Sequence, residues 1–177
     1  MINQDLINEA LLYASNKHNG QYMKQPIVPY MTHLQGVCLE AINGCINENN
    51  KDINLEKVTI LALLHDTMED TDATYEEVKD LFGEDVANGV LALTKNEKIP
   101  YSERMLDSIN RIKKQSVEVA IVKLADRIFN LKDVPIKWDK NKILAYKEEA
   151  KLILKELGFA SEYLSKRLQD KINVYGE

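Results

Sequence analysis

The sequence Leu61-Ala-Leu-Leu-His65-Asp66-Thr67-Met68-Glu69-Asp70-Thr71 runs from apolar residues directly into polar ones. On a helix, His65 and Asp66 diverge by about 100°, so a metal ion seated between them can accept one nitrogen and one oxygen ligand. Glu69 and Asp70 follow at i+4 from this pair, one turn away. Taken alone, such an acidic pair is more often a solvated helix end. Beside a metal centre, we expect it to do acid or base chemistry.

Two further metal-ligand candidates lie elsewhere in the chain. His33 follows Pro29-Tyr30-Met31-Thr32 and opens a predicted helix. Asp126 interrupts the apolar face of another helix, where a carboxylate needs a partner or a metal. Either residue alone would more often be structural. Together, two imidazoles and two carboxylates suit Mn²⁺, Fe²⁺ or Zn²⁺ better than an all-oxygen Mg²⁺ or Ca²⁺ site, and Mn²⁺ is our first choice.

The whole chain has the composition of an all-α globular protein. It has 177 residues, 45% of them hydrophobic and 29% charged, which fits one domain over residues 1–177. Apolar residues recur at helical intervals in nearly every segment. Thr74 with Glu77 predicts a capping box, while Gly83 and Pro135 are expected to end helices. Helices are predicted around Leu6–Ala14 and Leu34–Ile42, and near 55–66, 75–82, 85–94, 101–113, 117–133, 141–157 and 159–170.

Charge and apolar content limit the partners of the chain. A net charge of −5 gives no general attraction for a nucleic-acid polymer, so basic residues would have to bind a small anion locally. The amino terminus lacks a secretory pattern, and no stretch approaches the roughly 20 apolar residues of a membrane span. We therefore expect a cytoplasmic protein without a membrane partner. Cys38 and Cys45 are expected to stay reduced in or near the core. The sequence does not indicate an oligomeric state.

The order His33, His65-Asp66, Asp126 resembles the HD superfamily of metal-dependent phosphohydrolases, which implies an HD-type helical bundle. The run from His65 to Asp70 is similar to the His-Asp-x-x-Glu-Asp motif of its alarmone hydrolase branch, meaning the Rel/Spo hydrolase domain and the small alarmone hydrolases of the Mesh1 type. The resemblance covers residues 5–157 and implies the stand-alone form. Other matching pieces are His18-x-Gly20-Gln21, Pro29-Tyr30-x-x-His33, Phe82-Gly83, Thr94-Lys95 and Lys123-Leu-Ala-Asp126-Arg127-x-x-Asn130-Leu131.

The resemblance implies a Mn²⁺-dependent enzyme that removes the 3′-pyrophosphate from guanosine tetra- or pentaphosphate, yielding GDP or GTP and pyrophosphate. It implies that the metal ligands are His33, His65, Asp66 and Asp126. It implies that Glu69 and Asp70 position or activate the attacking water. The positions that match nucleotide or phosphate contacts of the family are Lys24, Thr94, Lys95, Asn130 and Tyr146.

One position departs from the family pattern. Relatives commonly carry Arg-Lys after the Gly-Gln pair, but here the arginine is replaced by Met23, followed by Lys24. An arginine stacks on a purine and pairs with phosphate, whereas methionine offers only apolar contact. Two alternatives therefore stay open. One is a phosphohydrolase for another nucleotide, such as an adenosine alarmone or NADPH, and the other is a nucleotide-binding module without turnover.

Overall fold

Three helices form the centre of the protein in the computed structural model, which describes residues 2–24, 27–48 and 52–176. They are α2 (Met31–Asn47), α3 (Leu55–Leu64) and α8 (Val117–Asn130), and α2 packs against both of the others. Helix α3 is buried without interruption over residues 58–64, and α8 over residues 118–128. Near-continuous apolar runs make this burial favourable on every face.

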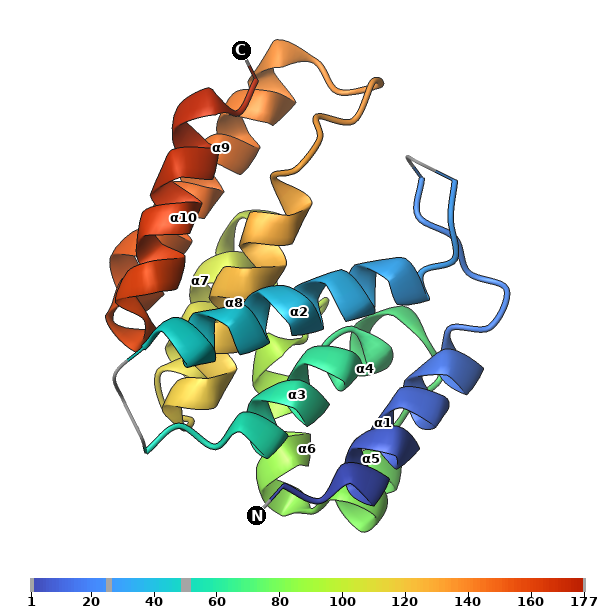
Figure 1. The fold of residues 1–177 in the computed structure, drawn as a ribbon. Coiled ribbons are helices and arrows are strands. Elements are labelled where there is room, and N and C mark those ends of the chain that lie inside the picture. The colour runs from blue at the N-terminus through green and yellow to red at the C-terminus, as the bar shows by residue number, and fades with distance from the viewer. Residues whose placement is uncertain (1, 25–26, 49–51, 177) are drawn as a thin grey trace.

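The remaining helices surround this centre, with α1 and α5 at one end of the molecule and α9 and α10 at the other (Figure 1). The predicted all-α fold is confirmed, since the described residues contain no strand beyond an isolated bridge between Tyr22 and Pro29. None of the described helices has the length and apolarity needed to cross a membrane. The surrounding elements are α1 (Gln4–Lys17), α4 (Thr67–Asp70), α5 (Tyr75–Phe82), α6 (Glu84–Leu93), α7 (Tyr101–Ile112), α9 (Lys140–Leu157), η1 (Gly158–Ala160) and α10 (Glu162–Val174).

Several helix ends follow the predicted local chemistry. Thr74 and Glu77 form the predicted capping box of α5, and Gly83, with φ of +87°, ends that helix. His18 is the C-cap of α1. Cys38 and Cys45 both lie on α2 as free thiols, the first buried and the second half-buried.

The predicted helix over 55–66 was too long. Helix α3 ends at Leu64, and a turn at His65 and Asp66 leads into the short α4. Side chains stop α3 because they take its last carbonyl groups: the His65 ring lies 2.8 Å from the Ala62 oxygen, and the Thr67 hydroxyl donates to the Leu64 oxygen at 2.7 Å. Such side-chain bonds compete with the helical backbone pattern.

Two other boundaries differ from the prediction. Helix α8 ends at Asn130 rather than near residue 133. The following segment leads into Val134, whose backbone is restricted away from helix by Pro135. The helix predicted over 159–170 starts later, at Glu162, because the Ser161 hydroxyl caps it by accepting from the Leu164 N–H at 3.0 Å. The described residues that follow α1 and α8 form loops. Residues 25 and 26 lie outside the described residues.

Candidate metal centre and substrate cleft

Three predicted metal ligands meet in the centre of the molecule. The Nε2 atoms of His33 and His65 are 3.2 Å apart. The Asp66 Oδ2 atom lies 3.2 Å from the first nitrogen and 3.1 Å from the second. Helix α2 supplies His33, and the turn between α3 and α4 supplies the other two. Both histidines are almost fully buried, and their Nε2 atoms face one another.

Asp126 approaches the same point from α8. Its Oδ1 atom is 3.6 Å from the His33 Nε2 atom and 3.8 Å from that of His65. The Asn130 amide donates to the same oxygen at 2.5 Å, and the Lys123 ammonium lies 3.2 Å from Oδ2. Three residues of one helix thus share a face at i, i+3 and i+7, which fixes the direction of the carboxylate.

Hydrogen bonding fixes the ring of His65. With the Ala62 oxygen 2.8 Å from Nδ1, the proton of a neutral ring belongs on Nδ1, because a carbonyl can only accept. The Nε2 lone pair then points toward Asp66 and His33. A backbone carbonyl on the second nitrogen is the usual support for a metal-binding histidine.

Electrostatics show how much this site favours positive charge. Burial alone would lower the pKa of His65, but Asp66 and Asp126 outweigh it and raise the pKa to about 9. Burial opposes ionisation of Asp66, yet the two imidazoles hold its pKa well below the usual range. The pKa of Asp126 is also lowered against burial, by Lys123 and His65. The imidazole nitrogens and carboxylate oxygens converge on one point, where a cation would be bound favourably.

The geometry of these donors fits a divalent metal ion. Ligands at right angles on an ion, each about 2.1 Å from it, are about 3 Å apart, close to the separations among His33, His65 and Asp66. These three form a metal-compatible cluster in the described part of the chain. The Asp126 oxygen is slightly more distant, at a position suited to a fourth ligand.

The two candidate catalytic acids lie beside this cluster in different surroundings. The Tyr30 hydroxyl is 2.7 Å from Asp66 Oδ2 and 3.1 Å from Asp70 Oδ2. The Gln21 amide donates to the Asp70 backbone oxygen at 2.8 Å. Burial, and then the charge of Asp66, raise the pKa of Asp70. Glu69 instead pairs with Lys95 at 2.8 Å. Asp70 therefore lies beside a hydroxyl group, and Glu69 is held in an ion pair.

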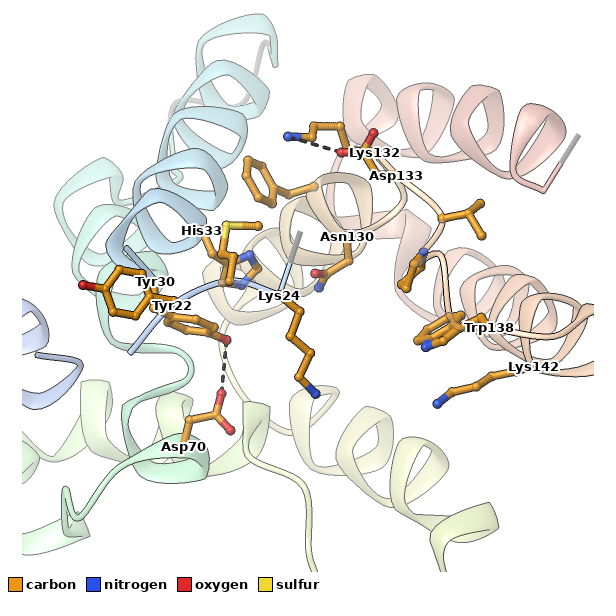
Figure 2. Close-up of a pocket in the computed structure, with 14 residues that line it drawn as sticks. Tyr22, Lys24, Tyr30, His33, Asp70, Asn130, Lys132, Asp133, Trp138 and Lys142 are labelled. Carbon is orange, nitrogen blue, oxygen red and sulfur yellow. Dashed lines mark hydrogen bonds and ion pairs between the residues drawn. The ribbon is translucent and has the colours of Figure 1, made fainter. Parts of the chain in front are cut away.

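A cleft of about 500 Å³ opens next to these residues. Figure 2 shows the Lys24 chain extending between Asp70 on one side and Trp138 on the other, with Asn130 facing the same space. The loop after α1 forms one wall, and the end of α8 and the following loop form the other. The residues that line the cleft include Tyr22, Met23, Lys24, Tyr30, His33, Asp70, Phe129, Asn130, Trp138 and Lys142.

The predicted nucleotide contacts do not all line this cleft. Lys24 and Asn130 do. Thr94 caps α6, with its hydroxyl donating to the Val90 oxygen at 2.9 Å. The Lys95 ammonium donates to the Glu69 carboxylate. Tyr146 packs behind the cleft wall, with its ring centroid 5.0 Å from that of Trp138.

Sequence reasoning missed three residues of this region. Tyr30 and Lys123 stood in motifs that were recognised, but neither was assigned a role; the structure puts both within hydrogen-bond distance of predicted ligands. The buried position of Lys123 at i−3 from Asp126 is a signal that the pattern did contain. Trp138 sits in a polar loop and gave no comparable signal.

Comparisons with known proteins agree with this geometry. A family model described as HD domain matches residues 10–159. The chain is 33% identical to the guanosine-3′,5′-bis(diphosphate) 3′-pyrophosphohydrolase MESH1 of Danio rerio, over 91% of this chain and 89% of that one. It is 34% identical to the Xenopus tropicalis protein of the same name, over 92% and 90%.

A solved structure is similar over almost its entire length. It has a TM-score of 0.84 and 31% identity, and the match covers 99% of this chain and 98% of the other. That protein is described as a metazoan ortholog of SpoT that hydrolyzes ppGpp and plays a role in starvation responses.

Proposed function

The chain belongs to the HD domain family, in the group that contains the MESH1 hydrolases, and we propose that it removes the 3′-pyrophosphate from guanosine-3′,5′-bis(diphosphate) nucleotides. The products are GDP or GTP and pyrophosphate. The observation that carries the proposal is the convergence of His33, His65 and Asp66 next to a cleft that also holds Asp70. A cytoplasmic location is part of the same proposal.

In this proposal, His33, His65, Asp66 and Asp126 hold a divalent ion, with Mn²⁺ as first choice and Fe²⁺ or Zn²⁺ as the others. When bound, the ion activates water and neutralises phosphoryl charge. The donor set supports this choice because imidazoles are borderline ligands and carboxylates hard ones.

Asp70 and Glu69 would manage the water and its proton. Asp70 is suited to a base because it is partly desolvated and lies on the cleft. A raised carboxyl pKa moves closer to neutral pH, where proton transfer is most efficient. The Tyr30 hydroxyl, 3.1 Å from Asp70, keeps that carboxylate oriented. Glu69, which is held in an ion pair with Lys95, would help to position the attacking water.

The nucleotide would lie along the cleft. Lys24 offers a point charge for phosphate, and Asn130, which donates to Asp126, lines the same cleft and would contact the nucleotide beside the ion. Thr94, Lys95 and Tyr146 remain candidates from the family resemblance. Tyr146 would then act by supporting Trp138 in the cleft wall.

A nucleotide panel tests the proposal. The metal-loaded protein is incubated with guanosine and adenosine 3′,5′-bis(diphosphates), NADPH and GTP, and the products are separated by chromatography. We expect GDP and pyrophosphate from the guanosine bis(diphosphate). If the guanosine bis(diphosphate) releases no pyrophosphate, the proposal is contradicted, and release from the adenosine bis(diphosphate) alone would favour the second candidate. The panel matters because Met23 lines the cleft and favours a base that does not need arginine stacking, so adenosine nucleotides are the second candidate.

A variant of Asp126 separates an enzyme from a binding module. If the site turns substrate over, Asp126→Ala loses metal and activity together. If the chain only binds nucleotides, the variant keeps its nucleotide affinity, and the unsubstituted protein shows no turnover. Calorimetry with GDP and metal analysis of the purified proteins distinguish these results.

A further inference from the structure

We propose that Lys95 is a positioning residue that acts through Glu69, rather than a contact to the nucleotide. The inference rests on the proposed function and refines it. The family resemblance places Lys95 among the phosphate-binding residues, but its contacts in this chain lead elsewhere.

Lys95 occupies both oxygens of Glu69. Its Nζ atom donates to Oε1 at 2.8 Å, and its backbone N–H donates to Oε2 at 2.9 Å. Only about a third of the Lys95 side chain and a fifth of the Glu69 side chain are exposed. Although burial opposes its charge, the carboxylate of Glu69 raises the pKa of Lys95. The ammonium therefore stays charged and paired.

The backbone donor is held in place from behind. Thr94 closes α6 by donating its N–H to the Val90 oxygen at 3.0 Å. The Arg111 guanidinium donates to the Thr94 carbonyl at 2.7 Å, and Asp107 holds Arg111 at 2.9 Å. The peptide that presents the Lys95 N–H is thus fixed between α6 and α7. Groups that are locked by their neighbours orient a functional side chain at little cost during the reaction.

Lys24 offers a clear contrast. It lines the cleft and, among the described residues, forms no ion pair with a carboxylate. A phosphate can bind Lys24 without breaking a bond. The Lys95 ammonium already donates to Glu69, and the negative charge of that carboxylate opposes the approach of a phosphate to the same ammonium. The two lysines therefore have separate tasks.

A double-substitution experiment tests this inference. Steady-state kcat and KM are measured for Lys95→Met, Glu69→Gln and the combined variant. If Lys95 acts through Glu69, Lys95→Met lowers kcat by about 10–100-fold and leaves KM nearly unchanged. The combined variant is then no slower than Glu69→Gln, since the partner through which Lys95 works has already been altered.

Two further variants complete the experiment. Lys95→Arg keeps the charge and the backbone donor and should recover most of the activity. Lys98→Met removes an exposed lysine from the same loop and should match the unsubstituted protein. A rise in KM of tenfold or more for Lys95→Met, or losses that multiply in the combined variant, would overturn the inference in favour of substrate contact.

A measurement without turnover separates the two proposals. A carbodiimide joins an amine to a carboxylate that touches it, and mass spectrometry of the digested protein identifies the joined peptides. We expect a Glu69–Lys95 link, absent in Lys95→Met. If the link forms but no nucleotide is hydrolysed, the proposed function fails and the pairing stands. If nucleotide is hydrolysed and no link forms, the Lys95 inference alone fails.

Discussion

Tyr30 links a predicted metal ligand, Asp66, to a predicted catalytic acid, Asp70, through one hydroxyl. That hydroxyl lies between Asp66 and Asp70, and the ring stacks on His18 at a centroid distance of 4.8 Å. His18 in turn contacts the Gln21 amide oxygen at 2.8 Å, and Gln21 holds the Asp70 backbone. The recognised His-x-Gly-Gln motif therefore has a physical task, which is to fix Tyr30 and Asp70 relative to each other.

Replacing Tyr30 with Phe should impair catalysis without unfolding the protein. The ring can still stack on His18, but the single hydroxyl hydrogen that lies between the two carboxylates is lost. We expect kcat/KM to fall by about 10–100-fold, as for other outer ligand supports, with the circular dichroism spectrum unchanged. Stopped assays and metal analysis measure the effect. Activity within twofold of the unsubstituted protein would show that the hydroxyl has no catalytic importance.

The pH dependence of kcat/KM should reflect Asp70. Burial and the charge of Asp66 raise its pKa, so the ionised fraction falls as the pH drops, and activity falls with it at a higher pH than for an ordinary carboxyl group. The Tyr30 hydrogen bond acts in the opposite direction. The acid limb of Tyr30→Phe should therefore move to higher pH. A limb that moves to lower pH would exclude Asp70 as the titrating base, provided that metal affinity is measured over the same range.

Among the secondary-structure elements, the start of α3 depends on α8. Asn54 caps α3 by accepting from the Lys57 N–H at 3.1 Å, and its own N–H donates to the Glu118 carboxylate of α8 at 3.0 Å. This joins the helix that leads to His65 with the helix that carries Asp126. Despite burial, the hydrogen bond from the Asn54 N–H helps to hold the pKa of Glu118 below its ordinary value.

Glu118→Gln should destabilise the protein at neutral pH. Hydrogen bonds to charged groups contribute more stability than those between neutral groups, so we expect the free energy of unfolding to fall by about 1 kcal/mol. Because the folded-state pKa is lowered, the contribution is complete above the usual glutamate pKa of about 4.3 and is lost as the pH falls through the lowered value. Urea unfolding at pH 7 and pH 3 tests this. An equal loss of stability in Glu118→Gln at both pH values would contradict this expectation.

Helices α2 and α8 approach closely at Gly36. A Cβ atom added there would lie 2.0 Å from the Phe129 ring, and that ring packs edge-on against His33, with centroids 5.2 Å apart. Gly36→Ala should therefore displace Phe129, weaken metal binding and cost about 1–3 kcal/mol. Gln35→Ala, at the exposed neighbouring position, is the matched control. Thermal unfolding and metal titration of both variants measure the difference. Equal stability and equal metal affinity in the two variants would show that the Phe129 ring moves aside at no cost.

For the whole molecule, helical periodicity was enough to predict the all-α fold and most helix positions. The positions of His33, His65 and Asp66 could be predicted because their motifs are compact and ordered. The end of α3 at Leu64 could not be predicted, because it depends on side-chain bonds from His65 and Thr67. The pairing of Lys95 with Glu69 was also missed, since it joins segments that meet only in the folded chain.

Helices α2 and α8 and the turn after α3 bring together the residues that we propose hold a metal for the removal of the 3′-pyrophosphate from the nucleotide. The most direct test is pyrophosphate release from guanosine-3′,5′-bis(diphosphate) while Mn²⁺ is titrated into metal-stripped protein. We predict no release without metal, saturable release of equal amounts of GDP and pyrophosphate as metal is added, and none from His65→Ala. Folded, metal-loaded protein that releases no pyrophosphate, or His65→Ala with undiminished release, would contradict the claim.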